Sequence, residues 1–219
     1  MTDATQARQE APPRKMSRET RRHQLIEATI ETLALRGYAS TTLTEVARTA
    51  GLSHGLVNFH FSTKDRLLAE TLHYIAEEYR LNWMHYLEIA APEPAAQLDA
   101  LLRADLDPKV CAPSRLSAWL AFWGEAQGRP LYQERASAND DLYIARLEDL
   151  CSRLMAEGGY VGEVRRIARV LRITAEGVWL DMMTMTAPYD VRESQATIFT
   201  CAAAFFPRHF GAEGLLAQR

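Results

Sequence analysis

The chain has 219 residues, a length that fits one domain or two small ones and can bury a sizeable core without disulfides or a metal. Hydrophobic residues make up 47% of it and charged residues 24%, with only 11 Gly and 9 Pro, which excludes collagen-like, low-complexity and wholly disordered chains. The formal net charge of −3, taken as one number, argues against a nucleic-acid-binding protein, because such proteins usually carry excess positive charge.

The first segment, residues 1–17, is polar and contains Pro12-Pro13, so we predict a flexible arm. Its end is basic, since five Lys and Arg residues fall between positions 14 and 22. A helix follows, because apolar residues from Leu25 to Leu33 recur at spacings of three and four and form one face. Gly37 is the expected end of this helix.

Residues 42–60 predict two short helices joined by a turn. Thr42 and Glu45 have the spacing of a capping box, in which each side chain accepts a hydrogen bond from the other residue's backbone N–H, so a helix is predicted over 43–50. Gly51-Leu52-Ser53 predicts a tight turn, because Gly adopts positive φ easily and Ser caps helices. A second helix is predicted over 54–60. The residues expected to hold it against the core are Leu56 or Val57, and Phe59.

From Lys64 a long helix is predicted to continue to about Ile89, with apolar residues at helical spacing on its buried side. Further helices, separated by turns that contain Pro or Gly, are predicted over about 95–104, 114–127, 131–157, 163–186 and 190–206. The alternating pattern of half-buried strands does not occur in the sequence, so the predicted fold class is all-α.

The charge is divided unevenly along the chain. Residues 1–65 carry nine Lys and Arg against seven Asp and Glu, a net charge of +2, whereas residues 66–219 carry 16 against 21, a net charge of −5. Residues 14–64 alone have eight basic and four acidic residues, a net charge of +4. The basic part coincides with the pair of short helices, so the total charge does not exclude DNA binding. A solvated basic surface is the alternative interpretation.

A helix-turn-helix places its second helix in the major groove of DNA, and the predicted helix over 54–60 suits that role. Gly55 would let the backbone approach the DNA, and Asn58 can form two hydrogen bonds with an adenine edge. Helical hairpins with Gly turns are common, so a purely structural hairpin is also compatible with this pattern.

The segment TTLTEVARTAGLSHGLVNFHFSTKDRLL, preceded by the basic SRETRRHQLIEATIETLALRGY, closely resembles the DNA-binding domain of the TetR family of repressors over about residues 17–70. The resemblance implies that Lys64, which begins the next helix, binds phosphate through its charge. The full set of implied DNA contacts is Arg21, Thr42, Thr44, Ser53, His54, Gly55, Asn58, His60 and Lys64.

The chain departs from the family where a run of the type Tyr-x-Tyr-Phe is usual, because it has Asn58-Phe59-His60-Phe61. Contacts to phosphate are therefore expected to differ at this point. His60 can still donate to a phosphate, and Asn58 contacts either a base or the backbone.

All four Trp residues lie in the acidic part of the chain. Trp119 and Trp123 are one helical turn apart on one face, with Phe122 beside them, and the acidic residues Glu125 and Asp181 follow closely after Trp123 and Trp179. Aromatic faces with a carboxylate suit an organic cation, because cation–π attraction is strong for a desolvated quaternary ammonium group. The alternative is that these aromatic residues simply fill a helical core.

The stretches RLSAWLAFW (115–123) and EGVWL (176–180) resemble segments of BetI-type regulators, the choline-responsive TetR members that repress genes of glycine betaine synthesis. The resemblance implies a dimeric repressor, paired through its last two helices on a palindromic double-stranded DNA operator, with a small organic cation as its ligand. The predicted ligand-binding residues are Trp119, Phe122, Trp123, Glu125, Trp179 and Asp181, with Tyr132 and Tyr143 as further candidates.

The domain organisation that follows has four parts: a flexible basic arm (1–17), a helix-turn-helix domain (18–65), a ligand-binding and dimerisation domain (66–207) and a tail (208–219). The alternatives are a TetR-like regulator of another ligand and an all-helical enzyme. No nucleophile–base pair or phosphate-cradling loop in the sequence supports an enzyme. A metal sensor is a third alternative, but His73 and His85 lie too far apart along one helix to share a metal.

The three cysteines, Cys111, Cys151 and Cys201, lack ligand spacing and fit free thiols in a reducing compartment. The sequence contains no apolar run of the roughly 18–20 residues that a membrane span needs, and no apolar stretch of a signal peptide at its start. We therefore expect a cytoplasmic protein that has neither a metal nor a cofactor and does not contact a membrane.

Overall fold

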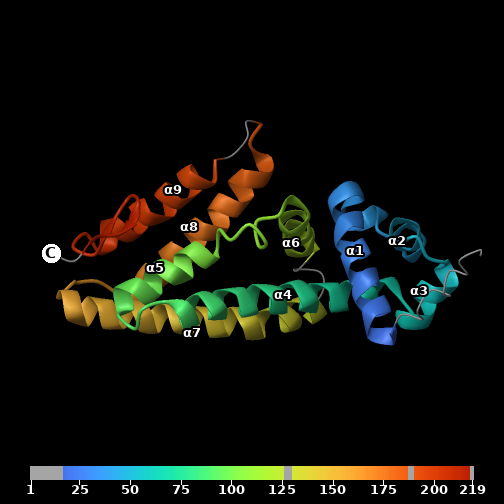
Figure 1. Ribbon diagram of the computed structural model, residues 1–219, viewed down its shortest axis with the longest axis horizontal. Helices are drawn as coiled ribbons and strands as arrows, with labels where there is room; N and C mark the ends of the chain where they lie inside the picture. The colour runs from blue at the N-terminus through green and yellow to red at the C-terminus, as the bar shows by residue number, and fades with distance from the viewer. Residues whose placement is uncertain (1–16, 126–129, 187–189, 218–219) are drawn as a thin grey trace, which may run out of the picture.

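The computed structural model describes residues 17–125, 130–186 and 190–217, with the backbone alone for 130–139, and this part of the chain is almost entirely helical (Figure 1). The helices are α1 (Arg18–Ser40), α2 (Leu43–Ala50), α3 (His54–His60), α4 (Lys64–Ile89), α5 (Pro94–Ala104), α6 (Pro113–Glu125), α7 (Pro130–Gly158), α8 (Val164–Thr184) and α9 (Val191–Phe205). The all-α prediction is confirmed, and the predicted bounds of the later helices agree to within two residues. The predicted arm, except for Ser17, lies outside the described residues.

Local signals set the ends of the first helices. Gly37 has φ +72° and breaks the helical path of α1, which resumes for one short turn up to Ser40. The Thr42 hydroxyl accepts a hydrogen bond from the backbone N–H of Glu45 at 3.2 Å, as the capping box predicts. The other half of the box is replaced, because the Glu45 carboxylate pairs with Arg36 at 3.0 Å and with Arg48 at 3.0 Å.

The turn between α2 and α3 follows the prediction closely. Gly51 has φ +65°, a left-handed backbone conformation that is energetically unfavourable for residues with a Cβ. Ser53 caps α3 by accepting from the backbone N–H of Leu56 at 3.3 Å. The sequence therefore defines the helix-turn-helix through contacts within about fifteen residues.

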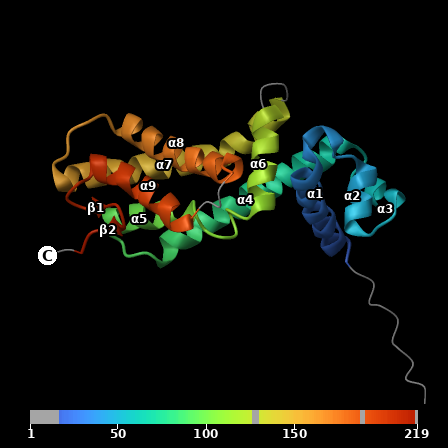
Figure 2. The ribbon, with the colours of Figure 1, turned by 90° about the horizontal axis from the view of Figure 1, so that it is seen from above.

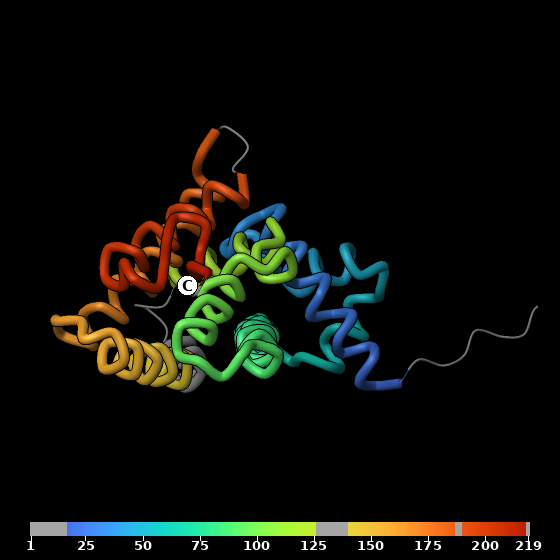
Figure 3. Tube along the Cα trace, turned by 60° about the vertical axis from the view of Figure 1, so that its left-hand side comes forward, coloured from blue at the N-terminus to red at the C-terminus, as the bar shows by residue number. Residues whose placement is uncertain are grey.

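We call α1–α3 the head and α5–α9 the body; α4 runs from one to the other (Figures 1 and 2). In the body, α4 packs against α5 and α7, α7 against α8, and α8 against α9. Figure 3, turned so that the body comes forward, shows the orange and red helices on the opposite side of the molecule from the blue α1. The head therefore stands at one end of an elongated molecule.

The cores of the two parts do not divide at residue 65. The head core, built around Leu25, Ile30 and Phe61, also contains the α4 residues from Leu67 to Ala76 and three residues of α6, namely Ala118, Trp119 and Phe122. Helix α6 lies against α1, as Figure 2 shows. The continuous α4 and the shared α6 thus connect head and body through buried side chains.

The segment predicted as a tail, 208–219, is part of the body as far as residue 217. Two short strands, β1 (Phe210–Gly211) and β2 (Gly214–Leu215), pair antiparallel. Phe210 is buried and its ring stacks on Phe199 of α9 with centroids 6.2 Å apart. Strands of two residues are too short to show an alternating sequence pattern, so the sequence did not reveal them.

Among the described residues, no helix is both long and apolar enough to cross a membrane. Cys151 is buried, Cys111 and Cys201 are half-buried, and all three are free thiols. Burial raises the pKa of the Cys111 and Cys151 thiols to about 12, so both are protonated at neutral pH.

Candidate functional site

Helix α3 is anchored to the head by one face and exposes the other. Val57 is fully buried, as is Phe61 just after the helix. Residues of α2 and α3 that were predicted to contact DNA are exposed: Thr42, Thr44, Ser53, His54, Gly55 and Asn58. A Cβ placed on Gly55 would meet nothing within 4 Å, so the backbone there is open to a close approach. Their contacts with DNA stay a prediction.

The basic start of α1 lies beside the end of α3. The Arg18 guanidinium is 5.7 Å from the centroid of the Phe59 ring, and that of Arg22 is 4.7 Å from the Phe61 ring. Arg22 also pairs with Glu70 at 2.8 Å, whereas Arg21 donates to Gln24 at 2.8 Å. The fold thus brings the positive charge of α1 to the helix that was predicted to enter the groove.

The burial of two residues of α3 is the reverse of the prediction. His60, predicted to donate to a phosphate, is only 8% exposed, and its pKa is lowered by burial and by the nearby charges of Arg18, Arg22 and Arg21. The ring is therefore neutral at pH 7 and packs edge-on against Phe59, with centroids 5.3 Å apart. Phe59, predicted to hold α3 against the core, is 68% exposed. Residues 57, 60 and 61 share the inner face at spacings of three and four, and residue 59 falls outside it.

Lys64, the predicted phosphate ligand at the start of α4, has protein partners. Its Nζ donates to the backbone carbonyls of Tyr38 at 2.9 Å and Ala39 at 3.2 Å, and it lies 5.0 Å from the centroid of the Tyr38 ring. The ammonium group therefore satisfies carbonyls at the end of α1, and its contact with DNA stays a prediction.

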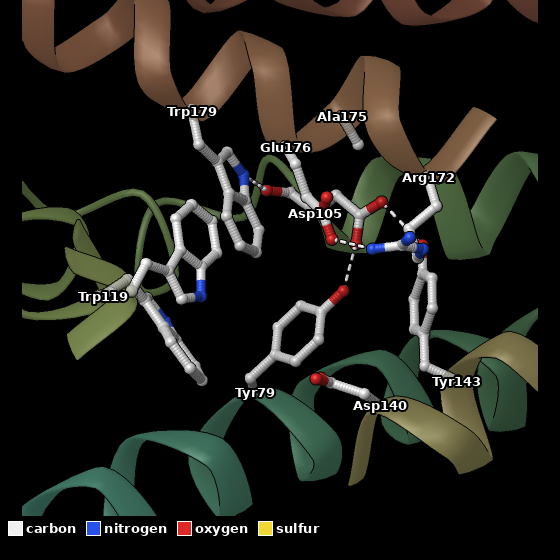
Figure 4. Close-up of a pocket in the computed structure, with 10 residues that line it drawn as sticks. Tyr79, Asp105, Trp119, Asp140, Tyr143, Arg172, Ala175, Glu176 and Trp179 are labelled. Carbon is white, nitrogen blue, oxygen red and sulfur yellow. Dashed lines mark hydrogen bonds and ion pairs between the residues drawn. The ribbon is translucent and has the colours of Figure 1, made fainter. Parts of the chain in front are cut away.

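A second candidate site is a pocket in the body, between α4, α6, α7 and α8 (Figure 4). Its volume is about 60 Å³, and since one water needs roughly 10–15 Å³ of such space, it holds a ligand group of only a few non-hydrogen atoms. The residues that line it are Tyr79, Asp105, Trp119, Trp123, Asp140, Tyr143, Arg172, Ala175, Glu176 and Trp179.

Aromatic rings form one wall of the pocket. The rings of Trp123 and Trp179 are nearly parallel, at 14°, with centroids 6.2 Å apart, and Trp119 is 6.2 Å from Trp123. Tyr79 of α4 meets Trp179 edge-on at 5.6 Å. Trp123 is 40% exposed and therefore lies at the mouth, whereas Trp119 and Trp179 are buried. These rings present several π faces around one small volume.

Asp105, in the turn after α5, connects the elements around the pocket. Its carboxylate accepts from the hydroxyls of Tyr79 and Tyr143, each at 2.7 Å, and its backbone carbonyl accepts from the Trp179 indole at 2.7 Å (Figure 4). Burial raises the pKa of Asp105 to about 7, against the lowering effect of the two tyrosine hydrogen bonds, and Glu176 raises it further. The carboxyl group therefore titrates near neutral pH.

Negative charge dominates the rest of the lining. Glu176 pairs with Arg172 one turn earlier on α8, so these two charges offset each other. Asp140 is exposed at the mouth, but the pocket wall partly desolvates its carboxyl group, and this desolvation and the nearby charge of Glu176 raise its pKa. Three carboxyl groups against one guanidinium favour a cationic guest.

Half of the residues predicted to bind a ligand line this pocket, and their contact with a ligand stays a prediction. Trp119, Trp123 and Trp179 line the pocket, as does Tyr143, whereas the Tyr132 side chain lies outside the described residues. The predicted residues that do not line it are Phe122, Glu125 and Asp181. Phe122 is buried in the head core and meets Tyr38 edge-on at 6.5 Å.

The two acidic residues of the predicted ligand set lie outside the pocket lining for a geometric reason. Glu125 and Asp181 each follow a pocket tryptophan by two positions, about 200° around a helix, so they turn away from it. Glu176 precedes Trp179 by three positions and shares its face, a signal present in the sequence. The other missed residues, Tyr79, Asp105, Asp140 and Arg172, come from four different segments.

Within the described residues, no group of three or more His, Cys, Asp and Glu side chains is placed to hold a metal ion. The pocket offers π faces, hydroxyls and carboxylates, which can bind and orient a cation. It contains no paired nucleophile and base among its described lining residues.

Comparisons with known proteins identify families for both parts of the chain. Residues 25–71 match the family model for bacterial regulatory proteins of the tetR family, and residues 94–207 match that for the C-terminal domain of BetI-type transcriptional repressors. The chain is 32% identical to the HTH-type transcriptional regulator BetI of Paraburkholderia phymatum, over 82% of this chain and 90% of that protein. It is 29% identical to the BetI regulator of Paraburkholderia xenovorans, over 84% and 93% of the two chains.

A solved structure shares the fold. A protein from Saccharomonospora viridis, crystallised in complex with choline, superposes with a TM-score of 0.76 and 18% sequence identity. The superposition covers 88% of this chain and 98% of that one. At this identity the likeness establishes the arrangement of helices.

Proposed function

The chain belongs to the TetR family of bacterial transcriptional regulators, with a C-terminal domain of the BetI type, and from this premise we propose that a small organic cation, choline or a related compound, sets its affinity for a specific operator. It is a DNA-binding regulator and not an enzyme. The head binds the operator, and the pocket in the body binds the cation.

The observation that carries the proposal is the aromatic pocket with its excess of carboxyl groups. A quaternary ammonium group desolvated against tryptophan faces gains about 2 kcal/mol from cation–π attraction. Asp105 lies on the opposite side of the same small volume and supplies the countercharge, and the carboxylate of Glu176, which is paired with Arg172, lies beside it (Figure 4). The volume suits a trimethylammonium head, and the choline found in the Saccharomonospora viridis protein of the same fold supports this ligand class.

Helix α6 is placed to carry a change in the pocket to the head. Trp119 and Trp123 of α6 line the pocket, while Arg115 of the same helix reaches the head. Arg115 donates two hydrogen bonds to Glu27 of α1, both at 2.9 Å, and two to Glu78 of α4, at 2.8 and 3.3 Å. A shift of α6 on ligand binding would therefore displace α1. A coupling of about 1–3 kcal/mol between ligand and operator suffices for a switch.

The proposed assembly is a homodimer on a palindromic operator. Two heads must reach successive major grooves about 34–36 Å apart, which one chain cannot do. Helix α8 carries apolar residues that are exposed in the isolated chain, namely Val170, Ile173 and Leu180. We place the dimer interface on α8 and α9, where a second copy would cover these side chains.

Calorimetric titration of the full-length protein with choline and with betaine aldehyde tests the ligand. Trp123→Ala, at an exposed position, should weaken binding by about tenfold or more while leaving the fold intact. Glu176→Gln should also weaken binding, because it removes a carboxylate and frees the Arg172 charge. Asp181→Asn, an equal change on the same helix but outside the pocket, is the matched control and should bind as the wild type does. Absence of heat with both ligands would exclude the cation assignment.

Operator binding is tested separately by selecting sequences from random duplexes with the full-length protein. Phosphate contacts predict that affinity falls steeply with salt concentration, and the selected sites should be palindromic. A protein that selects no sequence and shows no dependence on salt would contradict the DNA-binding part of the proposal.

A further inference from the structure

Phe59 is the exposed aromatic residue of the helix that the proposed function places in the major groove. It is 68% exposed, whereas Val57 and Phe61 on either side of it are fully buried. An apolar ring gains nothing from exposure to water, and the core of the head is complete without it. The exposed part of the Phe59 ring is therefore available to a partner outside the chain.

The ring shares one face of α3 with the residues that suit contact with DNA. Gly55, Asn58 and Phe59 stand at positions i, i+3 and i+4 of the helix, and all three are exposed. Because Gly55 leaves open space on this face, the helix can approach a surface closely there. A close approach would bring the Phe59 ring against the same surface.

The direction of the ring is supported by two neighbours. The Arg18 guanidinium lies 5.7 Å from its centroid, and the His60 ring packs against it edge-on, at 87° with centroids 5.3 Å apart. His60 is itself buried, so it gives the ring a fixed support. A side chain held in this way loses little conformational freedom when it binds.

The major groove offers one apolar group on its base edges, the C5-methyl group of thymine. We propose that Phe59 contacts a thymine methyl in each operator half-site and so determines specificity at that base pair. The inference rests on the proposed function, since it requires that α3 enters the major groove. Base stacking is the other use of an aromatic ring on nucleic acid, but it needs unstacked bases that an intact duplex does not present.

The expected effect follows from the size of one methyl group. Burying it changes affinity by about fourfold, so removing it from both half-sites of a symmetric operator should weaken binding by roughly tenfold to twentyfold. The same loss should disappear when the phenyl ring is absent.

The test replaces each thymine of the selected operator by deoxyuridine, which lacks the methyl group and keeps the base pair. Affinities are measured for the full-length wild type, for Phe59→Ala and for Asn58→Ala, the matched control on the same exposed face, after melting curves confirm that the variants fold. We expect one thymine per half-site at which uracil weakens the wild type and Asn58→Ala about equally but leaves Phe59→Ala unchanged. Phe59→Leu, which keeps an apolar side chain, should retain part of this sensitivity.

Two results would overturn the inference alone: Phe59→Ala responding to every uracil as the wild type does, or a half-site that contains no thymine sensitive to uracil. Absence of any salt-dependent binding to duplex DNA would instead overturn the proposed function. The two failures are therefore distinguishable within one series of measurements.

Discussion

Replacing Arg115 by Met should destabilise the protein and weaken the coupling between pocket and head. The Arg115 side chain is only 14% exposed and bridges Glu27 of the head and Glu78 of α4. Burial disfavours the charged guanidinium, but the hydrogen bonds that it donates to the Glu78 and Glu27 carboxylates outweigh this and raise its pKa. Met keeps the aliphatic stem and removes the charge, so the variant isolates the ionic contribution.

The magnitude follows from the partial burial of the three groups. A hydrogen bond to a charged group contributes about 1.5–3 kcal/mol when buried, and an exposed ion pair at most about 1 kcal/mol. Each glutamate keeps about a third of its side-chain surface in water, which screens the pair, but both would be left facing each other without a countercharge. We therefore expect a loss of about 2 kcal/mol in the free energy of unfolding.

Urea unfolding followed by circular dichroism measures this loss. Arg80→Met is the matched control. Among the ion pairs of the described residues, Arg80 pairs only with Glu77, three positions away in the same helix. The Arg80→Met variant should unfold at the same urea concentration as the wild type. Arg115→Lys should recover only part of the stability lost in Arg115→Met, since Lys keeps the charge but cannot reproduce the bidentate contact. The Arg115→Met variant should still bind the cation, but the cation should change the operator affinity of this variant less than it changes that of the wild type. Equal midpoints for Arg115→Met and Arg80→Met would show that the ion pairs of Arg115 with Glu27 and Glu78 add nothing to stability.

Three further predictions concern the pocket, the turn between α2 and α3, and the packing of α6. Because burial raises the pKa of Asp105 to about 7, lowering the pH from 8 to 6 protonates its carboxylate and removes a countercharge from the pocket. Cation binding measured by calorimetric titration should weaken by about fivefold over this range. An affinity that does not change with pH would be inconsistent with the site. Gly51→Ala should lower the free energy of unfolding in urea by about 1 kcal/mol, because φ at this position is +65°. Gly55→Ala should leave the stability unchanged, because φ there is helical and the space around it is open, but it should reduce operator affinity. Phe122→Ala should cost about 3–5 kcal/mol and Trp123→Ala far less, because only Phe122 is fully buried; the reverse order of melting temperatures would contradict the burial of α6.

The helix-turn-helix could be predicted because its signals are local. The caps Thr42 and Ser53 and the left-handed Gly51 act on residues a few positions away, and the structure places each as expected. The orientation of α3 could not be derived in the same way. In a helix of seven residues, the inner face depends on how the helix packs against the rest of the head, and so the burial of Phe59 and His60 was the reverse of the prediction.

The all-helical fold, the paired short helices and two rings of the aromatic wall could be predicted from the sequence alone. Trp119 and Trp123 stand four positions apart in one helix, where periodicity places them on one face. Which polar groups face that wall depends instead on how the helices pack. Tyr79 and Asp105 are far apart in the chain, and their meeting depends on how α4 and the turn after α5 pack together. Contacts between distant segments leave no periodic signal in a single sequence, so the countercharge of the pocket became visible only in the folded chain.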